Sequence, residues 1–224
     1  MEGDFFSEDE NFKSFIKTSK VYSKLVNFLT SKELTTTLIK YLDDQIQKEL
    51  DNSKLLIDPR TIEITSETLE TRLVDSIITS EINKIFPRLV IGYAKKGYSI
   101  NNDGRGIHTD NQKRLFSCLL YLKERYSMIG GEHSLYSMDE NYKMHLKECY
   151  TVKQDFFIAT LQNNTAFHDV NPILEIDGYR KAIYIGITCT EELWAPIRNK
   201  KHAKLTHNRQ LPMSLFKRIL KRLK

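Results

Sequence analysis

The chain has 224 residues, 40% hydrophobic and 28% charged, which is typical of a globular protein with one sizeable core. Its net charge of +5 is uneven, because the N-terminus (MEGDFFSEDENF) is acidic and the segment from Lys200 is basic. No apolar run is long enough for a signal peptide or a transmembrane helix, and the three scattered cysteines argue against a disulfide framework. We therefore expect a cytoplasmic protein.

Amphipathic helices are predicted in the first 87 residues: Val21, Leu25 and Phe28 recur at helical spacing, and two longer helices follow. Thr30 and Glu33 have the spacing of a capping box, with a hydroxyl at the N-cap and a glutamate three residues later. A second helix is predicted over Ser66–Phe86, ended by Pro87. The apolar residues of the first helix recur at helical spacing, namely Leu34, Leu38, Tyr41, Leu42 and Ile46.

From Arg88 the pattern changes to short runs rich in β-branched and aromatic residues, separated by Gly, Asn and Asp. The runs are RLVIGY, LFSCLLYL, EHSLYS, DFFIATL and RKAIYIGIT. Many short strands with turn signals predict a sandwich, a jelly roll or a barrel. No linker divides the chain, so we predict a single domain of residues 1–224. It would comprise supporting helices (1–87), a β core (88–190) and a basic tail (191–224).

The basic tail ends in SLFKRILKRLK, an amphipathic helical pattern. Its apolar face is expected to pack on the domain, and contact of its basic face with an anionic membrane or nucleic acid is the alternative. Trp194, the single tryptophan, is expected either to anchor the tail or to line a pocket. No pattern indicates an oligomeric state.

His108 and Asp110 lie two residues apart, just before the strand-like run Leu115–Leu122. On an extended chain this spacing puts both side chains on one face, as two thirds of a facial metal triad. Alone, this H-x-D motif is common by chance, and the pair has an equally good interpretation as a loop histidine and a turn aspartate. His168 follows the strand-like segment Phe156–Leu161, and Arg180 opens the next predicted strand along the chain.

This order of residues resembles the prolyl-4-hydroxylase-like branch of the iron(II)/2-oxoglutarate-dependent oxygenases. The resemblance covers roughly residues 88–188 and implies a double-stranded β-helix, a cupin-like jelly roll with supporting helices. The residues that carry it are Gly106–Asp110, Ser117–Leu122, Gly130-Gly131-Glu132, Phe167–Val170 with Pro172, and Arg180.

The resemblance implies a site residue by residue. His108, Asp110 and His168 would bind Fe(II), and Arg180 would pair with the distal carboxylate of 2-oxoglutarate, which its planar fork suits. A tyrosine would reach the same carboxylate: Tyr121, with a second contact from Tyr93 or, as an alternative, Tyr98. No catalytic residue beyond the metal ligands is implied, and ascorbate is a candidate reductant. An apolar wall is expected from Leu119 and Ile183.

Other interpretations of these residues stay open. Arg180 is also compatible with a surface cation at the start of a strand, and Tyr121 with plain core. His133 is expected to be a strand residue, and His145, His202 and His207 to be solvated. Two departures from the family pattern, Asp169 in place of a glycine and the long polar stretch Ser137–Val152, lie near the substrate entrance and leave the substrate class open.

The functional hypothesis is an Fe(II)- and 2-oxoglutarate-dependent dioxygenase. With dioxygen it would hydroxylate a small-molecule, saccharide or peptidyl substrate and release succinate and CO2. The alternative is a catalytically silent, metal-binding β-helix module that acts in binding or sensing. A third interpretation makes the basic tail primary, with nucleic acid as its partner.

Overall fold

The computed structural model describes residues 5–6, 14, 16–66, 83–94, 106–122, 127–153 and 155–197. In the N-terminal part of the described chain lie the helices α2 (Lys20–Leu29), α3 (Lys32–Tyr41) and α4 (Asp43–Asp51). The predicted continuous helix breaks at Leu42, and Tyr41 is 85% exposed rather than buried. The N-cap of α3 is Ser31, which accepts a hydrogen bond from Leu34 N, and not Thr30, which ends α2.

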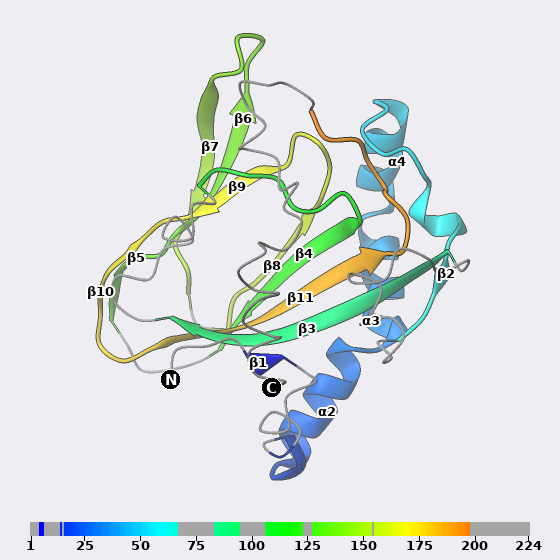
Figure 1. Ribbon diagram of the computed structural model, residues 1–224. Coiled ribbons are helices and arrows are strands. Elements are labelled where there is room, and N and C mark those ends of the chain that lie inside the picture. Colours follow the sequence, from blue (N-terminus) through cyan, green and yellow to red (C-terminus); the bar gives the residue numbers. More distant parts are fainter. Residues whose placement is uncertain are drawn as a thin grey trace, which may run out of the picture.

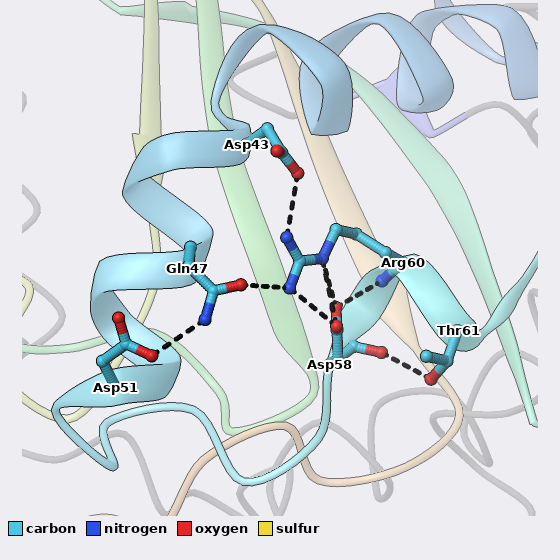
Figure 2. Close-up of polar contacts among 6 residues, drawn as sticks. All are labelled: Asp43, Gln47, Asp51, Asp58, Arg60 and Thr61. Carbon is cyan, nitrogen blue, oxygen red and sulfur yellow. Dashed lines mark hydrogen bonds and ion pairs between the residues drawn. The ribbon is translucent and has the colours of Figure 1, made fainter.

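A short 3-10 helix, η1 (Pro59–Thr61), is tied to α4 by one arginine (Figure 2). The guanidinium of Arg60 donates to Asp58, to Asp43 at 3.1 Å and to Gln47 at 2.7 Å. The three acceptors come from two segments, so this one side chain fixes the connection against the first turns of α4. Strand β2 (Glu63–Ile64) then runs parallel to the start of strand β3 (Lys84–Ala94).

The larger sheet has six strands in the order β1-β3-β11-β4-β8, with β2 also paired to β3. Its strands are β1 (Phe5–Phe6), β3 (Lys84–Ala94), β4 (Arg114–Tyr121), β8 (Phe157–Leu161) and β11 (Arg180–Cys189). Except for β2, each neighbouring pair is antiparallel. Figure 1 shows the helices on one side of this sheet and the remaining strands on the other.

The facing strands form two small sheets, β7-β6-β9 and β10-β5. They are β5 (Met128–Gly130), β6 (His133–Met138), β7 (Met144–Tyr150), β9 (Phe167–Val170) and β10 (Ile173–Ile176). His108 pairs with the free edge of β9 through an isolated antiparallel bridge to His168. Along the chain, β3 and β4 lie in the large sheet, β5 to β7 in the facing layer, β8 in the large sheet, β9 and β10 in the facing layer, and β11 in the large sheet again. The predicted double-stranded β-helix is therefore confirmed.

The predicted end of the second helix is wrong. Strand β3 begins at Lys84, so Phe86 and Pro87 belong to the sheet; residues 67–82 lie outside the described residues. Pro87 falls between the β3 residues that pair with β2 and those that pair with β1. Among the described residues, no strand pairs with Pro87 on the edge of β3 that carries β1 and β2. On that edge the missing N–H of Pro87 therefore costs no hydrogen bond between strands.

The main core lies between the helices and the large sheet. Strand alternation turns one set of residues toward the helices, including Phe116 and Cys118 of β4 and Ile183 of β11. Ile183 therefore belongs to the helix-side core and not to the wall predicted with Leu119. Trp194 is buried in the same core and donates from Nε1 to Arg114 O at 3.1 Å, which favours the anchoring interpretation.

Among the described residues, no helix combines the length and the apolar character needed to cross a membrane. The predicted basic helix near the C-terminus lies outside the described part of the chain. The division into helices, β core and tail stays a prediction, with β3 starting before the expected boundary at residue 88.

Candidate metal centre

Two histidines meet through a reciprocal pair of backbone hydrogen bonds. His108 N donates to His168 O at 3.0 Å, and His168 N donates to His108 O at 2.9 Å. Asp110 follows two residues after His108, so its carboxylate turns to the same side. The two Nε2 atoms lie 4.0 Å (His108) and 3.9 Å (His168) from Asp110 Oδ1. All three ligating atoms lie within 4.8 Å of one another, so the structure brings the predicted triad together.

Backbone carbonyls determine which ring nitrogen of each histidine faces the centre. His108 Nδ1 lies 2.8 Å from Gly106 O, and His168 Nδ1 lies 2.9 Å from Ala166 O. A carbonyl only accepts, so each Nδ1 carries the proton and each Nε2 presents a lone pair. Two lone pairs and a carboxylate oxygen then converge, an arrangement that a cation satisfies. Two imidazoles with one carboxylate suit Fe(II), and their role as its ligands stays a prediction.

Ser117 orients the carboxylate of the triad. Its hydroxyl donates to Asp110 Oδ2 and lies 3.3 Å from the Tyr184 hydroxyl, which leaves Oδ1 directed at the histidines. Burial opposes ionisation of Asp110, but at acid pH the charges of His168 and Arg114 outweigh it and hold the pKa of the carboxyl below 3.8. Ser117 had no predicted role. Its inward position on β4, seven residues after Asp110, is the signal that could have found it.

Arg114 is a second residue to which the sequence assigned no role. Its Nε and Nη1 atoms are buried and have no hydrogen-bond partner among the described residues. The guanidinium carbon lies 5.4 Å from the centre of the Tyr184 ring. Gly186 provides the space, because a Cβ there would come within 1.0 Å of Arg114 Nη1. The centre thus has a partly buried guanidinium close enough to the Asp110 carboxylate to lower its pKa.

Arg180 is buried, with 7% of its surface exposed, so its interpretation as a surface cation is wrong. Its Nη1 donates to Gly131 O at 3.0 Å, and its guanidinium carbon lies 5.7 Å from the centre of the Tyr121 ring. No carboxylate among the described residues forms an ion pair with Arg180. Gly131 is needed at this contact, because it has φ +76° and a Cβ there would lie 2.9 Å from Arg180 Nη1.

Tyr121 ends β4 with 1% of its surface exposed. Its register partner on β11 is Ala182, two residues from Arg180, so both its predicted role beside the anion anchor and plain burial agree with its position. The Tyr93 side chain and Tyr98 lie outside the described residues.

The remaining histidines divide as follows. His133 opens β6 and is buried, in agreement with the prediction of a strand residue. His145 is half exposed and pairs with Asp139 at 2.7 Å across the β6–β7 turn. His202 and His207 lie outside the described residues. The stretch Ser137–Val152 that departs from the family pattern forms this hairpin, and Asp169 is buried in β9, where its carboxylate accepts from Val170 N.

Comparison with solved structures finds chains of the family that the sequence resembles, at low identity. A prolyl 4-hydroxylase from Phytophthora capsici is 18% identical with a TM-score of 0.44, over 98% of this chain and 57% of that one. A 2OG-Fe(II) oxygenase family protein from Burkholderia pseudomallei is 16% identical with a TM-score of 0.35, over 55% of this chain and 53% of that one. A prolyl-4-hydroxylase from Pseudomonas putida is 17% identical with a TM-score of 0.32, over 46% and 52%.

The match thus spans little more than half the length of each of these structures. No family model matches the sequence, and no curated protein matches it.

Proposed function

We propose that the protein is an Fe(II)- and 2-oxoglutarate-dependent dioxygenase that hydroxylates a small-molecule, saccharide or peptidyl substrate. One observation carries the proposal: the interior of the β-helix holds both a triad of metal-ligand type and a buried arginine without a carboxylate partner among the described residues. A buried guanidinium without a counter-ion is costly, and an anionic ligand removes that cost. A 2-oxo diacid offers a chelating end and a second carboxylate, one for each feature.

The spacing of the two features supports a ligand of this size. Ser117 touches Asp110 at the triad, and Tyr121 lies beside Arg180. The two residues are four apart on β4, which is about 13 Å of strand. Part of this span is taken up by the metal and by the arginine side chain, so a short diacid fits the remainder.

Each residue of the site would have a distinct task. His108, Asp110 and His168 would hold Fe(II) on one face, and the metal would supply dioxygen activation coupled to decarboxylation of 2-oxoglutarate to succinate and CO2. The carbonyls of Gly106 and Ala166 keep both imidazoles in the ligating tautomer. Arg180 would bind the far carboxylate through its fork.

The test compares two histidine variants that differ in position. His108→Ala removes a triad member, whereas His145→Ala removes an exposed histidine that also pairs with an aspartate. Mn²⁺ affinity is measured by titration calorimetry, and succinate formation from 2-oxoglutarate is measured with Fe(II). We expect His108→Ala to lose more than about 100-fold in Mn²⁺ affinity and all succinate formation, because even an outer-shell partner contributes 10- to 100-fold.

Equal metal affinity in wild type and His108→Ala would refute the triad. Tight metal and 2-oxoglutarate binding without succinate from any substrate pool would favour the silent binding or sensing module instead.

A further inference from the structure

His133 lies on the inner face of the small sheet, next to the candidate metal centre. In the β6–β9 register Leu135 stands opposite His168, and His133 is two residues before Leu135 on the same face. The His133 and His168 rings stack with centroids 5.8 Å apart and planes inclined by 24°. The ring of His133 therefore lies against one of the triad rings.

The His133 ring has no hydrogen-bond partner within the described residues, although the residue is only 5% exposed. Neutral imidazole has one donor and one acceptor, and buried groups of this kind are nearly always paired. The triad histidines show the contrast, because each has its Nδ1 paired with a backbone carbonyl. An unpaired donor and acceptor, buried beside the triad, indicate a ligand that completes them.

The same ring lies toward the buried arginine. Gly131, two residues before His133, accepts from Arg180 and makes room for its guanidinium. The ring offers at least one N–H in either protonation state, because neutral imidazole keeps one ring proton and imidazolium carries two. The His133 ring contacts His168 of the triad, and the nearby Gly131 contacts Arg180.

We propose that His133 is a specificity-determining residue whose ring N–H donates a hydrogen bond to a carboxylate oxygen of the 2-oxo acid held between the triad and Arg180. The inference rests on the proposed function and deepens it. An apolar side chain at this position would contact the methylene carbons of the acid equally well but would donate nothing. A histidine there selects for a ligand with an acceptor facing β6.

The experiment is a calorimetric titration of 2-oxoglutarate into the Mn²⁺-loaded full chain, without dioxygen. We expect His133→Leu to bind 2-oxoglutarate about tenfold more weakly than wild type, the range for one hydrogen bond to a charged acceptor. His133→Gln, which keeps an N–H donor, should recover most of the loss. His145→Leu, an exposed histidine on the same hairpin, should bind as wild type does.

Two further readouts separate this role from a merely structural one. Mn²⁺ affinity should stay within about twofold in His133→Leu, because the ring is not one of the metal ligands. Its thermal midpoint should be unchanged or higher, because an unpaired buried polar group is replaced by an apolar one. His133→Leu binding of 2-oxoglutarate as tight as wild type would overturn the inference, as would an equal loss of Mn²⁺ affinity. Failure of wild type itself to bind 2-oxoglutarate would overturn the proposed function instead.

Discussion

Replacing Arg180 by methionine tests the anion anchor directly. Methionine fills a similar volume and removes the charge. Arg180 is 7% exposed, and its one hydrogen bond to a described residue goes to a backbone carbonyl rather than to a carboxylate. A carboxylate held by the fork gains two charge-assisted hydrogen bonds of about 1.5–3 kcal/mol each. Taking the lower values, about 3 kcal/mol is lost, so we expect 2-oxoglutarate to bind roughly 100-fold more weakly.

The assay pairs two ligands and two arginines. 2-Oxobutanoate has the same oxo-acid head but no second carboxylate, so its affinity for the Mn²⁺-loaded protein should be nearly the same in wild type and Arg180→Met. Arg60→Met is the matched control, because Arg60 is bound to Asp58, Asp43 and Gln47 on the outside of the domain (Figure 2). It should leave the affinity for both acids unchanged.

The refuting results are specific. If Arg180→Met weakens 2-oxoglutarate and 2-oxobutanoate by the same factor, the arginine does not bind the second carboxylate. If neither affinity changes, the buried guanidinium has another purpose. Mn²⁺ affinity should not move in either arginine variant.

Two further predictions concern the other face of the site and the core. Ser117→Ala removes the hydroxyl that orients Asp110, so Mn²⁺ affinity should fall by about tenfold in calorimetry. The control is Ser134→Ala, which removes a hydroxyl that contacts Cys149 and should leave Mn²⁺ affinity unchanged. Equal losses of Mn²⁺ affinity in both variants would contradict the role of Ser117. Burial raises the pKa of the Cys118 thiol from 9.0 to about 12. As the pH rises, the unfolded chain therefore releases this proton before the folded chain does. Above pH 9 the free energy of unfolding of wild type should decline, relative to that of Cys118→Val, by up to about 1 kcal/mol per pH unit in denaturant titrations. Parallel curves of unfolding free energy against pH for the two proteins would refute this prediction.

The grouping of the three residues was predicted from their order along the chain, which resembles a family pattern. The H-x-D spacing depends only on strand alternation, His168 follows the strand-like run that forms β8, and Arg180 opens β11. The structure adds what links these segments, the paired backbone hydrogen bonds between His108 and His168. That bridge joins residues far apart in the chain, so no local sequence pattern predicts it.

The residues to which the sequence assigned no role in the site were missed for a different reason. Whether Ser117, Arg114 or His133 faces the interior depends on register between strands and on space left by a partner such as Gly186. A shift of the pairing register by one residue exchanges the two faces of a strand. Ile183, which was predicted to line the site, faces the helix-side core instead. The end of the second helix was predicted wrongly because an apolar residue before a proline, here Phe86 before Pro87, is compatible both with the end of a helix and with the start of a strand.

The position of β11 has a consequence for the order of assembly. This last strand of the described chain lies between β3 and β4 in the middle of the large sheet. Its pairing with β3 closes a long loop, and Lys84 N reaches Thr190 Oγ1 across 106 residues. Such distant contacts form slowly. All three triad residues precede the strand that carries Arg180, so under the proposed function metal binding before β11 pairs would meet a large sheet that lacks its central strand. Productive loading of the metal should therefore follow the pairing of β11 with β3 and β4.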